Sequence, residues 1–364
     1  MLKIHDTVSL CAKCYRHVPA FVYEKDGKIL MDKTCTEHGT QTSVVETDPE
    51  FYYSLNHTNY VESFNQVLFE ASDRCQLNCP HCYHLPDNKI QDRSIQSVID
   101  QLNKFPKDCS PMLAGAEATL RPDFIELCQE MSKMEFKHLE VLSNGLMFAN
   151  EKWTQQVYNA GVTEMCFGLN HPSYQGDKVH NKQLRALEVL KASDWKIGYV
   201  GYTIEDLDHL PFILNEIKEI NGPSIHHFRI RCGSFIGRSS DKQRSYLSNL
   251  VKEIRNLTND EIVPFPSDDN PYHVMVDWNG ILLRLIQWPD VTNIDMEELI
   301  TGPWCQFYEE GPITNFVHQA ITRDAFKNMN MPMLDVAPTK YQYRSMSASN
   351  YKHWKDGWNG PTSI

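Results

Sequence analysis

The sequence lacks any uninterrupted apolar run near the roughly 20 residues that a membrane-spanning helix needs. Its first ten residues carry Lys3, His5 and Asp6 where a secretory signal peptide has an apolar core. No low-complexity linker and no solenoid-type repeat is present. We therefore expect an ordered protein without a membrane span that works in the cytoplasm.

Positive charge is scarce as well. The 364 residues include 35 Lys and Arg against 47 Asp and Glu, a formal net charge of −12. Proteins that coat nucleic acid must neutralise phosphates with Lys and Arg, so this balance disfavours that class. A chain of this length favours one barrel-sized catalytic domain with smaller modules.

The eleven cysteines are an odd number, and in a chain without a signal peptide they favour metal ligation over a disulfide framework. Six of them fall into two close-spaced groups. The others lack the spacing of an auxiliary iron–sulfur site, and Cys128 belongs to the apolar stripe of a helix, where a free thiol behaves as a small hydrophobe. These scattered cysteines are Cys109, Cys128, Cys166, Cys232 and Cys305.

The first cysteine group predicts a structural zinc site in a module spanning residues 1–65. Two pairs with knuckle spacing flank an alternating stretch that turns at Asp26-Gly27: Cys11 with Cys14, and Cys35 with His38. Three thiolates and one imidazole can close a tetrahedral zinc site. Two alternatives stay open: His17 replaces His38, or the thiols are unligated core residues and His38 is solvated.

From residue 66 onward, short apolar runs alternate with amphipathic helices, which is typical of βα units around a parallel sheet. Apolar residues at i, i+3, i+4 and i+7 predict helices over 95–102, 124–131 and 210–217. The predicted strands are Val67–Phe69, Met112–Ala114, Leu139–Leu142, Met165–Leu169, Ile197–Tyr202 and Phe228–Arg231.

The fold class we expect is therefore α/β, a partial (β/α)6 TIM-type barrel over residues 66–240. It follows the zinc module and precedes a C-terminal α+β extension over residues 241–364. In that extension the sequence predicts a helix over 246–254 and a hairpin with strands 273–277 and 281–286 that turns at Asn279-Gly280.

The second cysteine group follows the first predicted strand, where a barrel places its active-site loop. Cys75, Cys79 and Cys82 form a C-x3-C-x2-C array with His81 before the last cysteine. A cubane cluster normally takes four thiolates, so three leave one iron open for an exogenous ligand. The array resembles the cluster motif of the radical S-adenosylmethionine (SAM) superfamily, which has an aromatic residue where His81 stands.

That resemblance implies a [4Fe–4S] cluster on the three cysteines and SAM on the open iron. Gly115-Ala116-Glu117 is similar to the superfamily's Gly-Gly-Glu segment, which contacts the methionyl amino group. The second glycine of that segment is Ala116 here, and Ala118 stands where proline is common.

Three further segments after predicted strands resemble cofactor contacts of the same superfamily. Ser143-Asn144-Gly145 is similar to its Thr-Asn-Gly end, and Asn170 stands where a polar residue meets the ribose. Gly233 to Gly237 resembles the glycine-containing segment beside the adenine. The alternatives are an ordinary turn at Asn144-Gly145 and a helix cap at Asn170; Arg238 would hold a substrate anion or a structural carboxylate.

The activity that the resemblance implies is reductive cleavage of SAM to a 5′-deoxyadenosyl radical that abstracts hydrogen from a substrate carbon. A flavodoxin- or ferredoxin-type protein would donate the electron. Rearrangement or carbon–carbon bond formation would follow. A zinc module before such a core resembles the subgroup of tetraether lipid synthase, which suggests coupling of lipids or small metabolites.

Two other functions remain open from the sequence. One is isomerisation of an amino-acid-modified thymidine in hypermodified DNA, as in phage radical isomerases, which would place the enzyme in the host cytoplasm. It draws on an aromatic and basic tail that could bind nucleic acid, although packing of these aromatic side chains over the barrel is the favoured interpretation. The other is a non-catalytic iron–sulfur and zinc redox sensor. The tail residues are Tyr341, Tyr343, Arg344, Tyr351, Lys352, Trp354, Lys355 and Trp358.

Overall fold

A computed structural model describes residues 1–14, 17–55, 66–82, 86–89, 91–103, 107, 110–193, 195–233, 245–266, 273–287, 292–293 and 295. The described residues fall into two compact units. The first draws on residues 1–64, 232–276 and 285–364, and the second on residues 65–231 and 277–284. Each unit is described by itself.

The first unit begins with a four-stranded antiparallel meander. Its strands are β1 (Leu2–Leu10), β2 (His17–Lys25), β3 (Lys28–Cys35) and β4 (Gly39–Glu46). Asp26 and Gly27 both have positive φ, 51° and 69°, which matches the twist of a tight hairpin between β2 and β3. Val22, Ile29 and Met31 form its core, each at most 1% exposed. The predicted hairpin is confirmed, and β1 and β4 extend it on both sides.

The second unit is built on a parallel sheet in which the strands follow one another in chain order. Every strand predicted for the barrel is present, and β13 (Ile281–Ile286) lies beside the last of them. The fold class is therefore the predicted α/β type. The strands are β5 (Gln66–Ser72), β6 (Ser110–Gly115), β7 (Glu140–Ser143), β8 (Glu164–Gly168), β9 (Lys196–Ile204) and β10 (Ile225–Cys232).

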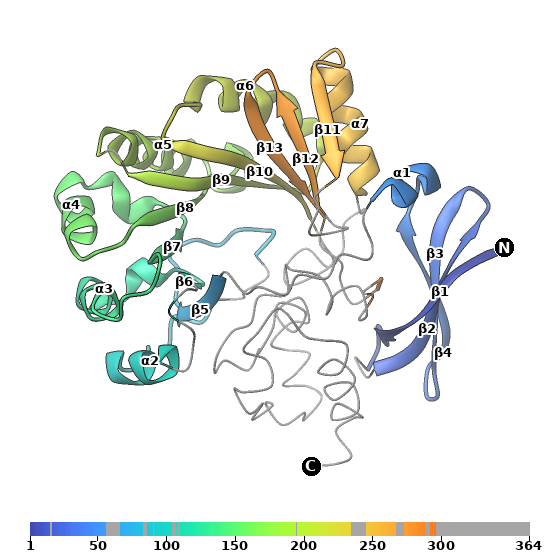
Figure 1. Ribbon diagram of the computed structural model, residues 1–364, viewed down its shortest axis with the longest axis horizontal. Coiled ribbons are helices and arrows are strands. Elements are labelled where there is room, and N and C mark those ends of the chain that lie inside the picture. Colours follow the sequence, from blue (N-terminus) through green and yellow to red (C-terminus); the bar gives the residue numbers. More distant parts are fainter. Residues whose placement is uncertain are drawn as a thin grey trace. The chain divides into compact units, whose positions relative to one another are not determined.

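The helices of this unit lie along the outer side of the curved sheet (Figure 1). The predicted apolar stripe of α3 is buried, since Phe124, Leu127, Cys128 and Met131 are each at most 1% exposed. Cys128 is thus a core thiol, as predicted. The helices are α2 (Ile95–Leu102), α3 (Phe124–Ser132), α4 (Glu151–Asn159), α5 (Asp177–Ala192) and α6 (Leu210–Ile220).

The later part of the chain contains the predicted helix and hairpin. They are α7 (Leu247–Leu257), then β11 (Ile262–Pro266), β12 (His273–Trp278) and β13. Asn279 and Gly280 have φ of 51° and 84°, as the predicted tight turn requires. Among the helices that the structure describes, including the short α1 (Pro49–Ser54), none is long and apolar enough to cross a bilayer.

A buried carboxylate joins the end of the meander to α7 within the first unit. Glu46, the last residue of β4, is 4% exposed. It accepts hydrogen bonds from Ser248 Oγ at 2.5 Å and from the Thr47 backbone nitrogen at 2.6 Å. Burial raises the pKa of Glu46, and the hydrogen bonds from Ser248 and Thr47 offset part of that rise.

Candidate functional site

The four predicted zinc ligands lie together at one end of the meander. Cys11, Cys14, Cys35 and His38 place their ligand atoms within 4.8 Å of one another. His38 Nδ1 lies 3.5 Å from Cys35 Sγ and 3.6 Å from Cys11 Sγ, and the sulfurs of Cys14 and Cys35 are 3.8 Å apart. A tetrahedron with Zn–S bonds of about 2.3 Å has edges of roughly 3.8 Å. The donor set and its spacing therefore fit a zinc ion.

Polar groups around Cys11 favour its thiolate. Gln41 donates from Nε2 to Cys11 Sγ at 3.3 Å, and its Oε1 accepts from the Ala12 backbone nitrogen at 3.0 Å. Burial raises the pKa of Cys11, but hydrogen bonds from the backbone of Cys14 and Lys13 and from Gln41 outweigh it and lower the pKa to about 6. The thiol therefore ionises near neutral pH, as a metal ligand must.

The second cysteine group lies on the loop that follows β5. Cys75, Cys79 and Cys82 are all partly exposed. The Cys82 backbone nitrogen donates to the Cys79 carbonyl at 3.2 Å, and the Leu77 nitrogen donates to Cys75 Sγ at 3.3 Å. Burial raises the pKa of Cys75 to about 12, and the charge of Glu117 adds to the rise. Without a metal this thiol keeps its proton at neutral pH, and ligation of a metal would have to displace it.

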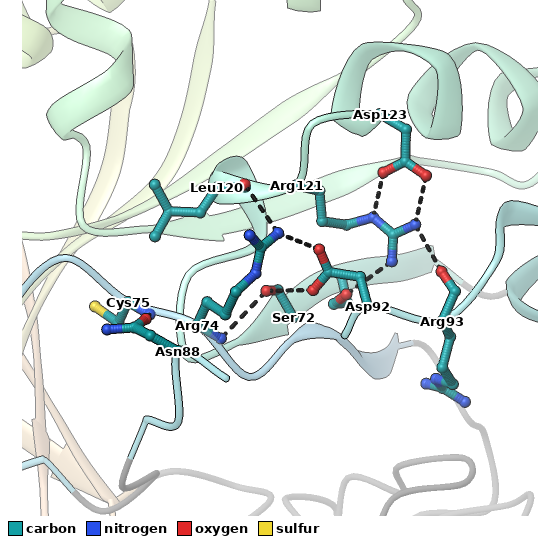
Figure 2. Close-up of polar contacts among 10 residues, drawn as sticks. Ser72, Arg74, Cys75, Asn88, Asp92, Arg93, Leu120, Arg121 and Asp123 are labelled. Carbon is teal, nitrogen blue, oxygen red and sulfur yellow. Dashed lines mark hydrogen bonds and ion pairs between the residues drawn. The ribbon is translucent and has the colours of Figure 1, made fainter. Parts of the chain in front are cut away.

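The residue before Cys75 is fixed by an ion pair that the sequence did not predict (Figure 2). The Arg74 guanidinium pairs with the Asp92 carboxylate and also donates to the Leu120 carbonyl at 3.1 Å. Ser72 joins the network, since its Oγ donates to Asp92 Oδ1 at 2.7 Å and accepts from the Arg74 backbone nitrogen at 3.2 Å. The first turn of the cysteine loop is thereby anchored to the end of β5.

A second arginine, Arg121, makes hydrogen bonds to the same region from a buried position. Arg121 is 3% exposed and makes two parallel 2.9 Å hydrogen bonds to the Asp123 carboxylate. It also donates to the carbonyls of Ala71 and Arg93, each at 2.9 Å (Figure 2). Because a buried guanidinium is costly without partners, these four bonds hold β5 and the segment before α2 in one arrangement.

The Gly115-Ala116-Glu117 segment follows β6 and runs close to the end of β5. Gly115 has φ of +109°, and a Cβ there would lie 2.4 Å from the Ser72 carbonyl oxygen, so only glycine fits. The Ala116 nitrogen donates to that same oxygen at 2.8 Å. Ala116 therefore does not prevent the close strand contact.

Glu117 is 1% exposed and accepts hydrogen bonds from the segments that follow β6 and β7. Its Oε1 accepts from Thr119 Oγ1 at 2.5 Å and from Ser143 Oγ at 2.8 Å. Its Oε2 accepts from the Asn144 backbone nitrogen at 2.8 Å. Burial raises the pKa of Glu117, and the hydrogen bonds from Thr119, Asn144 and Ser143 oppose that rise. Its contact with the methionyl ammonium stays a prediction.

The Ser143-Asn144-Gly145 turn brings the end of β7 to the cysteine loop. Gly145 has φ of +82°, and a Cβ there would lie 2.0 Å from the Phe167 ring, so the position requires glycine. Asn144 Nδ2 lies 3.8 Å from Cys75 Sγ and 3.4 Å from Gln76 Oε1. Two predicted site residues distant in sequence, Cys75 and Asn144, are therefore neighbours.

Asn170 follows β8 by two residues, and both its backbone and its side chain make hydrogen bonds. Its Oδ1 accepts from the Thr203 nitrogen at 3.4 Å, and its carbonyl oxygen lies 3.0 Å from His180 Nδ1. The short helix over Pro172–Tyr174 is capped by His171, whose side chain accepts from the Ser173 nitrogen. The helix-cap alternative for Asn170 is therefore wrong, because its neighbour fills that place.

The carbonyl of Asn170 contacts a buried group of three residues that the sequence did not predict: His180, Glu216 and Tyr202. His180 Nε2 lies 2.6 Å from Glu216 Oε1, and Tyr202 donates to Glu216 Oε2 at 2.8 Å. Both ring nitrogens of His180 face oxygen atoms, an arrangement that favours the protonated ring. Burial alone would lower the pKa of His180, but the hydrogen bond and charge of Glu216 outweigh it and raise the pKa.

Several predicted residues lie outside the described part of the chain. These are Gly237 and Arg238, the aromatic tail, and Cys109 and Cys305; of the adenine segment only Gly233 is described. Cys166 and Cys232 are buried, at 2% and 0% exposed, and burial raises the pKa of Cys232 to about 12. Burial of both thiols disfavours their reaction with solutes.

Comparison with protein families finds two matches. Residues 3–47 match the HMPTM N-terminal zinc ribbon domain, and residues 69–234 match the radical SAM superfamily. Among curated proteins the chain is 27% identical to the 7,8-dihydro-6-hydroxymethylpterin dimethyltransferase of Methanocaldococcus jannaschii. That match covers 43% of this chain and 37% of the relative.

Among solved structures, the chain is similar in part to Streptococcus suis SuiB bound to its precursor peptide SuiA. It has 10% identity, a TM-score of 0.42, and covers 69% of each chain. Methylornithine synthase has 13% identity and a TM-score of 0.39, over 58% of this chain and 66% of that one.

Proposed function

We propose that this chain, in which a zinc ribbon precedes a radical SAM domain over residues 69–234, cleaves SAM at a cluster held by Cys75, Cys79 and Cys82. Three partly exposed thiols on one loop carry the proposal. Cys128 and Cys166, the other described cysteines of that unit, are at most 2% exposed, so neither offers a fourth ligand. One iron of a cubane would then be left open.

A radical SAM domain uses a [4Fe–4S] cluster and SAM, which together supply a 5′-deoxyadenosyl radical able to take hydrogen from an unactivated carbon. The chain's own residues position the sulfonium ligand and exclude competing reactions. In this proposal the cofactor contacts come from Gly115, Glu117, Ser143, Asn144, Asn170 and Gly237. A flavodoxin- or ferredoxin-type protein donates the electron.

The proposed role of the zinc ribbon is structural. Cys11, Cys14, Cys35 and His38 hold one zinc ion in a closed, four-ligand site. Such a site leaves no open position for a substrate or a water, so its role is to fold the ribbon.

For the reaction itself we favour carbon–carbon bond formation on a small heterocyclic metabolite. The support is the curated relative, whose name describes transfer of two methyl groups to a pterin, a flat nitrogen heterocycle. Of the alternatives open from the sequence, this favours small-metabolite coupling over DNA isomerisation. The DNA proposal depends on the aromatic tail, which lies outside the described residues.

The direct test is SAM cleavage by anaerobically reconstituted protein reduced with dithionite, followed by detection of 5′-deoxyadenosine. We expect product from the wild type and from Cys128→Ala, a matched control whose thiol is buried in α3. We expect none from Cys79→Ala. Equal product from Cys79→Ala, or none from a wild type that holds four irons, would reject the proposal and leave a redox sensor.

The substrate class is tested by adding candidate substrates and measuring whether each one stimulates SAM cleavage. A reduced 6-hydroxymethylpterin should raise the yield of 5′-deoxyadenosine and gain mass in the presence of a one-carbon donor. Stimulation by single- or double-stranded DNA and not by the pterin would contradict the small-metabolite proposal.

A further inference from the structure

The side-chain amide of Asn144 has a defined orientation. Its Oδ1 lies 3.1 Å from the Leu146 backbone nitrogen, a group that can only donate. This contact fixes which end of the amide is oxygen. The opposite end, the Nδ2 amino group, therefore faces Cys75 Sγ at 3.8 Å.

The backbone of Asn144 is held on both sides by buried groups. Its nitrogen donates to Glu117 Oε2 at 2.8 Å, and its carbonyl accepts from Gln183 Nε2 at 2.9 Å. Gln183 is 1% exposed and also donates to the Gly168 carbonyl at 3.0 Å. With Leu146 as a third anchor, Asn144 is placed by β6, β7 and α5 before any cofactor binds.

The sulfur of Cys75 thus receives two N–H groups. The Leu77 backbone nitrogen is 3.3 Å away, and the Asn144 amide approaches from the end of a different strand. Hydrogen bonds to the sulfurs of an iron–sulfur cluster stabilise its reduced, more negative form and raise its reduction potential. Of the two donors that the structure describes at this sulfur, Asn144 is the one whose N–H a side-chain substitution removes, because Leu77 uses its backbone.

We propose that Asn144 sets the reduction potential of the cluster by donating a hydrogen bond from Nδ2 to the thiolate of Cys75. This inference rests on the proposed function, since it needs a cluster on Cys75. It assigns Asn144 a positioning role toward the cluster sulfur, beyond any contact with SAM.

The test is a redox titration of the reconstituted cluster, followed by electron paramagnetic resonance without SAM. Asn144→Leu removes the donor at similar size, and Asn144→Asp keeps the shape but removes the N–H and adds negative charge. Both should lower the potential, Asp more than Leu. The control is Gln76→Leu, because exposed Gln76 contacts the same amide at 3.4 Å; its potential should match the wild type.

The outcomes separate this inference from the proposed function. A wild type that forms no four-iron cluster rejects the proposed function itself. A four-iron wild type whose potential is unchanged in both Asn144 variants, or shifted as much by Gln76→Leu, overturns only the role of Asn144. Loss of iron from both Asn144 variants also overturns it, because the amide would then hold the cluster rather than tune it.

Discussion

Glu117 Oε2 accepts a hydrogen bond from the backbone nitrogen of Asn144 at 2.8 Å, which ties the end of β6 to the end of β7. The sequence places both residues among the contacts to SAM. In the structure the carboxylate is 1% exposed and serves three donors of the chain itself: Thr119, Ser143 and Asn144. The carboxylate therefore holds the segments that follow β6 and β7 together through donors of the chain itself.

Replacing Glu117 by alanine should lower the free energy of unfolding by about 3 kcal/mol, because buried donors left without an acceptor cost about 1–3 kcal/mol each. Urea denaturation of the zinc-loaded protein measures this change. The matched control is Glu126→Ala, an exposed glutamate on α3, for which a change under about 0.5 kcal/mol is expected. Equal changes in the free energy of unfolding in the two variants would show that the hydrogen bonds of Glu117 do not stabilise the fold.

Gly145→Ala should destabilise far more than Gly280→Ala, although the two glycines have similar φ of +82° and +84°. The backbone conformation costs alanine about 1–2 kcal/mol at either position. Only at 145 does the new methyl meet a neighbour, the Phe167 ring at 2.0 Å, which adds about 1–3 kcal/mol of overpacking. Melting temperatures of the two variants measure the difference, and similar losses would contradict the close packing of Gly145.

The His180–Glu216 pair predicts a pH dependence of stability. The folded-state pKa of His180 is raised above its ordinary value of about 6.5. Its contribution is therefore complete below that value and is lost as the pH rises through the folded pKa. The difference in melting temperature between wild type and His180→Gln should shrink as the pH rises above about 6.5. His138→Gln, at a partly exposed histidine, should show no such trend.

If the difference in melting temperature between wild type and His180→Gln stayed constant with pH, the ion pair would not be the cause of the pH dependence. Glu216→Gln offers a second check, because it removes the charge but keeps the contacts to His180 and Tyr202. This substitution should abolish the pH dependence of the stability contribution, because glutamine has nearly the same size and shape as glutamate.

Loss of zinc should unfold the ribbon, because the binding free energy of a structural zinc site contributes directly to folding. Cys14→Ser is expected to lower zinc content from one ion per chain to near zero. Metal analysis and the near-ultraviolet circular dichroism of the ribbon check this outcome. A folded ribbon without zinc would contradict the structural role, and full zinc in Cys14→Ser would remove Cys14 from the ligand set.

Much of the fold follows from local patterns in the sequence. Stripes of apolar residues predicted α2, α3 and α6, and the Asn279-Gly280 pair predicted the hairpin of β12 and β13, all of which the structure contains. The Cys75, Cys79 and Cys82 array resembles the radical SAM cluster motif, which implied a cluster and SAM, and the paired spacing predicted a zinc module; residues 69–234 match the radical SAM superfamily and residues 3–47 a zinc ribbon. Spacing works here because a cluster or zinc ion needs ligands close together in the chain.

The supports of the site could not be predicted in the same way. Arg74 and Asp92, or His180 and Glu216, are 18 and 36 residues apart, and no local period links them. Arg74 and Asp92 lie on the one loop between β5 and α2, and His180 and Glu216 lie on the separate helices α5 and α6, so each pair meets only through the tertiary fold. For the same reason Glu117 could be recognised from its motif, while its bonds to Ser143 and Asn144 could not.

The central claim is that one iron of the cluster is open to SAM, and its most direct test is the electron paramagnetic resonance spectrum of the reduced protein before and after SAM is added. We predict that SAM changes the spectrum of the wild type and of Cys128→Ala. A spectrum from four irons that SAM leaves unchanged, in protein known to be reduced, would contradict the account.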